Sequence, residues 1–293
     1  MRRASRYPQA HRKCHFDWNP NVGYPLCVEL GLPRRVSWTT GAVFAVFYLW
    51  AGLGLSIGLH RFFTHRSFQC GNGMVVWLAL GACFTWQGTI LRWVADHRRH
   101  HKYHDHAGDV HSPIFTSRGR RLNLLRGLLH AHFAWMFDDT TTDPTVYAPD
   151  LLRDPLIMHF VTFYPLYAFL SLALPTAAGY LLGGASEAVR CLLWAGFARI
   201  TLIHHGTWAI NSICHTYGRQ DFASGDQSRN VWFLSILLFG EGLHNNHHAA
   251  PTSACLNFLP GQSDWGGWIL RCLARLGAVS KLKRANVTLL TLR

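Results

Sequence analysis

The sequence predicts an all-α integral membrane protein whose helical cap, on the cytosolic side, carries a histidine-rich metal centre. Three observations lead to this fold class. Of the 293 residues, 49% are hydrophobic and only 15% are charged, whereas about 25% of the residues of soluble domains are charged. Several apolar segments are long enough to cross a bilayer. In addition, three short histidine clusters have the spacing of metal ligands.

Composition also divides the chain and limits its partners. Residues 1–35 form a polar, basic N-terminal segment, and residues 36–293 form the membrane-embedded domain. The formal net charge is +13. Beside apolar spans, this charge favours anionic lipid headgroups or a phosphate-bearing substrate as partners, and not nucleic acid. The eight cysteines form no C-x2-C pair, which argues against a thiolate zinc site or a rubredoxin-type site.

Three apolar segments are candidates for membrane spans, because a crossing helix needs about 20 residues. They cover residues 36–59, 156–182 and 188–210. A Gly-Gly turn joins the second and third segments, so we expect them to form a hairpin that returns the chain to its starting side. The apolar run at 231–240 is too short to cross, and polar residues interrupt the run at 74–91.

The three histidine clusters have to lie on one side of the membrane if they build one site. Residues 74–91 separate the first two clusters, so we expect this segment to lie along the membrane surface and not to span it. Arginines and lysines gather around the second and third clusters, which places this side in the cytosol. The basic residues before the first span conflict with that orientation. Either residues 36–59 do not cross simply, or a further span precedes them.

The histidine clusters have the spacings H-x4-H, H-x2-H-H and H-x2-H-H. Their eight imidazoles belong to His60, His65, His97, His100, His101, His244, His247 and His248. On a helix, positions i, i+3 and i+4 share one face, so each H-x2-H-H cluster can direct three imidazoles inward. Positions i and i+5 diverge by about 140°. His60 and His65 therefore converge only if the helix ends near Phe62, or else they serve different metals.

Eight imidazoles exceed the three protein ligands of a typical catalytic zinc ion, which favours two metal ions. Imidazole suits iron, zinc, copper and nickel, and redox chemistry with O2 favours iron. We interpret ten further histidines as ordinary hydrogen-bonded residues; they are His11, His15, His104, His106, His111, His130, His132, His159, His204 and His205. A metal transporter is a weaker alternative, because transporters place their ligands at mid-membrane whereas these clusters follow the ends of the spans.

Residues of about 50–275 resemble the membrane fatty acyl desaturases, in particular the acyl-CoA Δ9 (stearoyl-CoA) branch. The similarity is specific because several motifs occur in the same order and at the same separation. The main motifs are Gly58-Leu-His-Arg-Phe-Phe-Thr-His-Arg-Ser-Phe, Asp96-His-Arg-Arg-His-His-Lys-Tyr-His-Asp, Asn211-Ser-Ile-Cys-His215 and Gly240-Glu-Gly-Leu-His-Asn-Asn-His-His-Ala.

The resemblance implies a di-iron centre, with two Fe ions held by nine histidines and one asparagine-bound water. The eight clustered histidines then act as ligands, His215 is the ninth, and Asn211 holds the water. Asp96, which precedes the second cluster, is expected to orient one of its imidazoles. The resemblance also implies a bent, buried acyl tunnel whose kink is lined by Gln87, Trp93 and Thr207, with Trp208 adjoining.

The implied reaction is the O2-dependent desaturation of a saturated fatty acyl chain, of the acyl-CoA Δ9 type, to a cis-monounsaturated chain. A related hydroxylase or acetylenase is an alternative. Electrons come from an external donor of the cytochrome b5, ferredoxin or rubredoxin type. Gly88 and Ala95 stand where the animal enzymes hold the CoA headgroup, so an acyl-phospholipid substrate is also open. Four arginines between residues 118 and 126 can bind phosphate, or they form a solvated or lipid-facing charge run.

Overall fold

The computed structural model describes residues 36–292, and the predicted basic segment 1–35 lies outside the described residues. Helices dominate, which confirms the predicted all-α class. The one sheet among the described residues pairs two short antiparallel strands, β1 (Gln69–Cys70) and β2 (Val279–Ser280). The division of the chain near residue 36 stays a prediction.

The first long helix consists of α2 (Trp38–Leu53) and, directly after it, the π-helix η1 (Gly54–Thr64). Ser37 caps its N-terminus by accepting a hydrogen bond from the backbone N–H of Thr40, which satisfies one of the free amides of the first turn. The combined helix Trp38–Thr64 is long and apolar enough to cross a membrane. It begins at Trp38, just inside the predicted span at 36–59, and ends later than that prediction, at Thr64.

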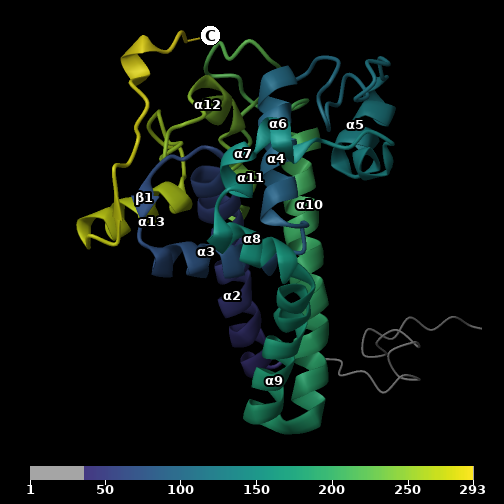
Figure 1. The fold of residues 1–293 in the computed structure, drawn as a ribbon, viewed down its shortest axis with the longest axis vertical. Coiled ribbons are helices and arrows are strands. Elements are labelled where there is room, and N and C mark those ends of the chain that lie inside the picture. The colour runs from purple at the N-terminus through teal and green to yellow at the C-terminus, as the bar shows by residue number, and fades with distance from the viewer. Residues whose placement is uncertain (1–35, 293) are drawn as a thin grey trace, which may run out of the picture. The chain divides into compact units, whose positions relative to one another are not determined.

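The predicted hairpin is formed by α9 (Tyr164–Cys191), η3 (Leu192–Ala198) and α10 (Arg199–Ser212) (Figure 1). The chain reverses at Gly183 and Gly184, where Gly184 has φ of 73°, a conformation that favours glycine. The first arm begins at Tyr164 and not at residue 156, because Asp154 caps a separate helix, α8 (Pro155–Thr162).

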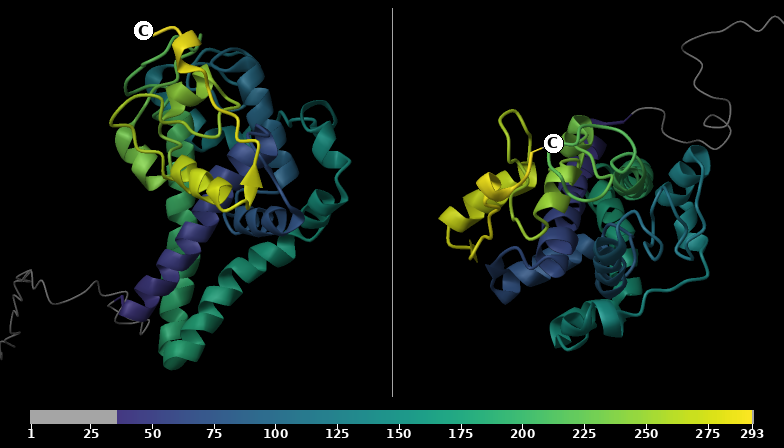
Figure 2. Two further views of the ribbon diagram at one scale, coloured as in Figure 1. Left: turned by 90° about the vertical axis from the view of Figure 1, so that its left-hand side faces the viewer. Right: turned by 90° about the horizontal axis from the view of Figure 1, so that it is seen from above.

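The start of α2 lies beside the tip of this hairpin. Thr40 Oγ1 donates a hydrogen bond to Glu187 Oε1 over 2.6 Å, and Ser37 contacts the same carboxylate. The helices α2, α9 and α10 thus run together as an apolar stalk (Figure 1). The remaining elements form a cap at its other end, which Figure 2 shows from two further sides.

The cap contains mostly short helices. They are α3 (Asn72–Cys83), α4 (Ile90–Tyr103), α5 (Leu124–His132), η2 (Ala134–Phe137), α6 (Pro144–Tyr147), α7 (Pro149–Leu152), α8, α11 (Trp232–Leu237), α12 (His244–Ala249), α13 (Trp265–Arg275) and η4 (Val287–Leu289). As predicted, the apolar run at 74–91 does not span. At 1.5 Å per residue α3 is about 18 Å long, which is shorter than the roughly 30 Å of a hydrocarbon core.

The largest apolar core joins the stalk to the cap. Leu55, Leu59 and Phe63 of η1 are buried against Leu78 of α3 and Val94 of α4. The helices η1 and α3 approach so closely that a Cβ on Gly54 would lie 2.2 Å from the backbone of α3. This packing holds the π-helix and α4 rigidly beside each other, and both carry clustered histidines.

Candidate metal centre

The π-helix η1 explains how His60 and His65 converge. The backbone N–H of His65 donates to the carbonyl oxygen of His60 over 3.2 Å, which is the i→i+5 hydrogen bond of a π-helix. Residues five apart therefore lie above one another, and the two ring centroids are 4.9 Å apart. The sequence offered two alternatives, a helix end near Phe62 or ligands to different metals, and neither is needed, because widened helical turns continue to Thr64 and bring both residues into one group.

The structure gathers all nine predicted histidine ligands into two groups. Within each group the candidate ligand nitrogens lie within 4.8 Å of one another. Site A consists of His60, His65, His97, His101 and His247. Site B consists of His100, His215, His244 and His248.

Each H-x2-H-H cluster is divided between the two sites. On α4, two imidazoles one helical turn apart, those of His97 and His101, face site A, and His100 faces site B. On α12, His247 faces site A and the other two face site B. Asn211, near the end of α10, lines a small cavity together with His100 and His244. The two short helices thus bridge a pair of adjacent sites.

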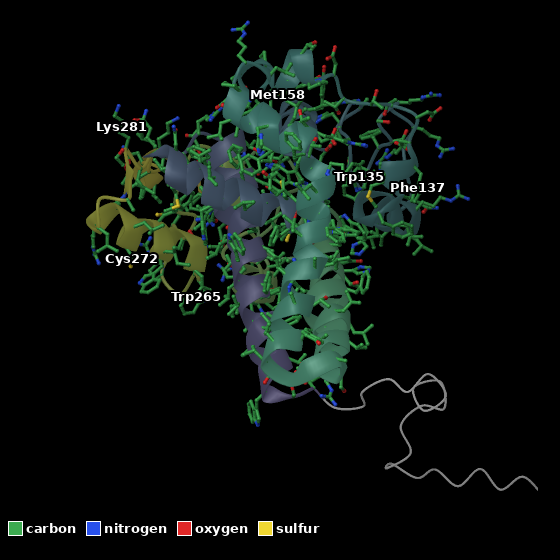
Figure 3. All side chains as sticks on the ribbon, turned by 60° about the horizontal axis from the view of Figure 1, so that its bottom comes forward. Trp135, Phe137, Met158, Trp265, Cys272 and Lys281 are labelled. Carbon is green, nitrogen blue, oxygen red and sulfur yellow. The ribbon has the colours of Figure 1, made fainter. Side chains whose placement is uncertain are left out.

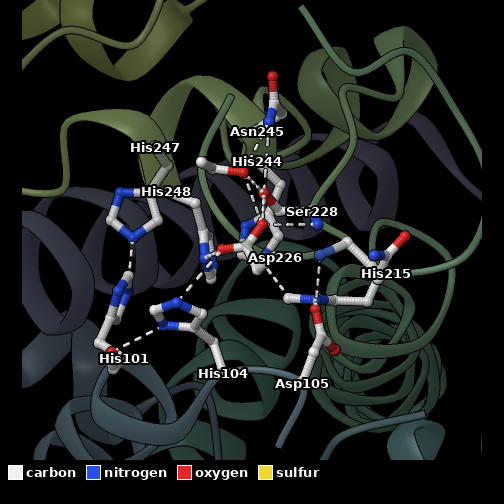
Figure 4. A network of polar contacts seen from close by, with 12 residues as sticks. His101, His104, Asp105, His215, Asp226, Ser228, His244, Asn245, His247 and His248 are labelled. Atoms are coloured by element: carbon white, nitrogen blue, oxygen red, sulfur yellow. Dashed lines mark hydrogen bonds and ion pairs between the residues drawn. The ribbon is translucent and has the colours of Figure 1, made fainter. Parts of the chain in front are cut away.

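Buried carboxylates hold four of the imidazoles at Nδ1 (Figure 4 shows two of these pairs). The pairs are His60 with Glu241 at 2.5 Å, His100 with Asp109 at 2.9 Å, His215 with Asp105 at 3.0 Å and His248 with Asp226 at 2.5 Å. Metal-binding histidines commonly have such a partner, which selects the tautomer and orients the ring.

The Nε2 atoms point toward one another inside the sites. His100 Nε2 lies 3.3 Å from His248 Nε2, and each of these rings uses Nδ1–H to bind a carboxylate. A neutral imidazole has one N–H, so both Nε2 atoms present lone pairs to each other. His215 Nε2 and His244 Nε2 are 2.9 Å apart, which is hydrogen-bonding distance. Facing lone pairs are stabilised by a cation between them, so the donor set fits metal ions that accept imidazole.

The environment keeps most of these imidazoles neutral, as metal binding requires. Burial, reinforced by neighbouring imidazoles, lowers the pKa well below its usual value for His65, His97, His101, His244 and His247. Burial also lowers the pKa of His248 to about 4, although Asp226 acts in the opposite direction. His215 differs, because the Asp105 carboxylate outweighs burial and raises its pKa.

Asp96 does not have the role that the sequence predicted. Its carboxylate lies 3.7 Å from Arg92 and borders a cavity, and it contacts no imidazole among the described residues. Successive residues of an α-helix point about 100° apart, so Asp96 borders the cavity beside His97 without contacting its imidazole. Sequence analysis missed the four carboxylates that do contact imidazoles. The one sequence signal is that Asp105 and Asp109 closely follow the second histidine cluster and Glu241 precedes the third; Asp226 has no such signal.

A cavity of about 290 Å³ leads to the metal centre, and all four predicted tunnel residues line it. Trp93 Nε1 donates to Gln87 Oε1 over 3.0 Å, and Gln87 Nε2 donates to Thr207 Oγ1 over 2.6 Å. These hydrogen bonds make one continuous wall from α4 to α10, with Trp208 beside it. His97 and Asn211 stand at the inner part of the same cavity.

Comparison with known proteins identifies the family of the chain that carries this site. The family model described as fatty acid desaturase matches residues 37–258. The chain belongs to the fatty acid desaturase family. This confirms the resemblance seen in the sequence, and the chain is therefore a membrane enzyme, an oxidoreductase that acts on fatty acyl chains.

Several characterised desaturases and one acetylenase are similar to this desaturase-family chain. It is 40% identical to the hex-5-enoyl-[acyl-carrier protein] acetylenase of Moorena producens, over 79% of the chain and 73% of that protein. It is 32% identical to the sn-1 stearoyl-lipid 9-desaturase of Anabaena variabilis, over 87% of the chain and 88% of that protein. It is 31% identical to the delta-9 acyl-lipid desaturase 1 of Arabidopsis thaliana, over 86% of the chain and 77% of that protein.

Two positions of this desaturase-family chain bear on how the acyl chain is carried. Gly88 lines the cavity, and a Cβ at this position would meet no other atom within 4 Å. Ala95 is buried in the apolar core on the other side of α4, with an exposure of 1%. Neither residue offers a side chain that could hold a CoA headgroup.

Proposed function

We propose that this enzyme removes two hydrogens from adjacent methylenes of a fatty acyl chain in an O2-dependent reaction, at a pair of iron ions. The observation that carries the proposal is the convergence of nine imidazoles, in two groups, at the inner end of an aromatic-lined cavity. The five histidines of site A would bind one ion. The four of site B would bind the other, with Asn211 holding a water molecule beside it.

An alkyl C–H bond is not acidic, so general-base chemistry cannot break it. A bound pair of iron ions supplies the oxidising power that this bond requires. The chain itself positions the substrate. The hydrogen-bonded wall of Gln87, Trp93 and Thr207 cannot adjust one residue without breaking a contact to the next. Such a rigid wall selects which carbons lie beside the metal centre.

Four carboxylates complete the chain's contribution. They keep a proton on Nδ1 of the imidazoles they contact and leave Nε2 free to bind metal. Glu241 stays ionised because the His60 and Arg61 side chains outweigh its burial and lower its pKa to about 2. Removing one of these carboxylates would release the ring it orients.

The electron balance requires a partner. Reduction of O2 to two waters takes four electrons, and formation of one double bond supplies two. We infer that a separate redox protein of the cytochrome b5, ferredoxin or rubredoxin type supplies the other two. We also propose that the cap faces the cytosol, because arginines and lysines gather around the second and third histidine clusters.

We propose a saturated chain and a cis double bond at a Δ9-type position as the first substrate and product to test. The names of similar proteins include acyl-CoA, acyl-lipid and acyl-carrier substrates. The lack of a headgroup contact at Gly88 and Ala95 favours a carrier other than CoA, and an acyl lipid is the alternative that we favour.

Formation of a triple bond is the second candidate function. The 40% identity to an acetylenase supports it, and the same hydrogen removal applied to an existing double bond would give an alkyne. A hydroxylase would instead add one oxygen atom.

Product analysis separates these reactions. The chain would be expressed in a host without desaturases and fed saturated and monounsaturated fatty acids. Mass spectrometry with double-bond mapping would then identify the products. We expect loss of two hydrogens from the saturated chain; conversion of the monounsaturated chain alone would assign the acetylenase activity. An added oxygen atom, or no new product from either feed, would contradict desaturation.

A further inference from the structure

The segment formed by α5 and η2 exposes an unusual amount of apolar surface. Phe137 is 81% exposed and Leu125 is 69% exposed, and Phe137 lies at the outer edge of the cap in Figure 3. The exposed apolar residues of this segment are Leu124, Leu125, Leu129, Phe133, Met136 and Phe137. Large apolar side chains exposed in such number along one short segment indicate an interaction site. We call it the α5–η2 surface.

A basic group adjoins the α5–η2 surface. Arg118, Arg120, Arg121 and Arg126 are all exposed. Asp139 pairs with Arg118 over 2.6 Å. The other three arginines have no carboxylate partner within the described part of the chain. Apolar side chains bordered by unpaired arginines are the pattern by which a segment binds the interface of an anionic bilayer.

The position of α5 places this surface next to the membrane. His132 Nε2, at the end of α5, lies 3.0 Å from His205 Nδ1 on α10. About one helical turn closer to the hairpin tip, Thr201 and Leu202 of α10 are exposed. The α5–η2 surface therefore continues the lipid-facing side of the stalk.

The same segment borders the entrance to the cavity. Trp135 and Met136 of η2 line it together with Gly88 and Arg92. Met136 is 38% exposed and so reaches both the cavity and the surface. A ligand that covered the α5–η2 surface would lie directly at the cavity mouth.

We propose that the α5–η2 surface docks into the anionic headgroup layer of the membrane that the stalk crosses. The arginines bind lipid phosphate, and the apolar side chains enter the boundary of the acyl region. The cavity mouth then opens at the lipid surface, so an acyl chain enters from a membrane lipid. This last step rests on the proposed function. An acidic carrier protein would pair with the arginines and leave six apolar side chains without an apolar complement.

Spin labels can test the docking without measuring turnover. The full chain would carry Leu125→Cys or Phe137→Cys, and Val146→Cys on α6, which is 60% exposed, would be the matched control. The accessible cysteines would first be replaced by serine. The proteins would be placed in nanodiscs of phosphatidylglycerol and phosphatidylcholine. We expect the ratio of oxygen to nickel-chelate accessibility to be several-fold higher at residues 125 and 137 than at 146. Equal ratios at all three positions would overturn the proposal.

A second arm tests the arginines and the other occupant. With Arg120, Arg121 and Arg126 replaced by serine, the accessibility ratio at Phe137→Cys should fall in nanodiscs that contain phosphatidylglycerol. No change there would overturn the role of the arginines. In a further measurement, an acidic acyl-carrier protein would be added to the labelled chain. If it shielded the label while lipid composition had no effect, docking of the α5–η2 surface to the membrane would be refuted. These measurements report the depth of the label in the bilayer and not turnover. A failure of the docking proposal can therefore be distinguished from a failure of the proposed desaturase function.

Discussion

Sites A and B are built from the same side-chain type but are supported differently. Site B has four imidazoles, and three of them have a carboxylate of their own at Nδ1. Site A has five imidazoles, and Glu241 is the one carboxylate that contacts them among the described residues. Glu241 also lies 3.1 Å from the buried Arg61, which Asp264 binds as well. Site B is thus oriented by ionic partners, whereas site A depends on the packing of η1 and α4.

This difference shows how a chain can support two metal sites with few acidic residues. The rings of site A come mainly from long, well-packed helices whose backbone already defines their direction. Site B takes ligands from α12, from the turn that follows α10 and from α4. His215 follows the end of α10 and His248 lies on the short α12, and at both positions a carboxylate at Nδ1 limits rotation of the ring. The following predictions test this comparison, in order of decreasing effect.

Loss of one ligand from either site should have the largest effect. We expect His100→Ala in site B and His247→Ala in site A each to abolish product formation and to lower bound iron, because both ions are needed for the reaction. Product would be measured by mass spectrometry and iron by elemental analysis of purified protein. His159→Ala, a cap histidine that contacts Tyr167, is the matched control. Normal turnover in either ligand variant would refute the assignment.

Loss of a supporting carboxylate should have an intermediate effect that differs between the sites. Asp226→Asn should weaken metal binding by roughly 10–100-fold, as for other partners of metal-bound histidines, and mainly at one of the two ions. Glu241→Gln should lower metal binding and also stability, since it weakens the neutralisation of Arg61. Iron content and thermal unfolding would be compared with those of Asp139→Asn, an exposed control. If both variants behaved alike in both assays, the contrast between the sites would fail.

A bulkier residue in the tunnel wall should change selectivity more than rate. Thr207→Phe would break the hydrogen bond from Gln87 and fill the cavity, so we expect shorter accepted chains or a shifted double bond. The products would be mapped by mass spectrometry. Thr201→Phe, on the exposed side of the same helix, is the control and should leave the products unchanged. An unaltered product profile in Thr207→Phe would remove this residue from the tunnel wall.

The smallest effect is expected at the carboxylate that the sequence favoured. Asp96→Asn should leave iron content unchanged, because its side chain contacts Arg92 and not an imidazole. Burial raises the pKa of Asp96, so removal of its charge should also cost little stability. The iron content of this variant would be measured by elemental analysis and compared with that of Asp109→Asn. A loss of iron in Asp96→Asn equal to that in Asp109→Asn would restore the original expectation.

Much of the fold was predictable because its signals are local. Hydropathy identified the helix Trp38–Thr64 and the hairpin of α9 and α10, and the polar interruptions of 74–91 argued against a fourth crossing. Spacing identified the eight clustered imidazoles as one functional set. The start of α9 was misplaced because a proline-led helix, capped by Asp154, is as apolar as the span that follows it.

The sequence by itself determined which residue types meet: apolar helices that need lipid, and imidazoles whose helical spacing makes them point together. Only the tertiary structure decided how those imidazoles divide and what holds them. The π-helical turns that align His60 with His65 depend on packing against α3 and α4, and the partners of His215 and His248 lie 110 and 22 residues away along the chain. Periodicity describes neighbours on one helix, whereas a buried ion pair depends on which distant segments the core brings into contact.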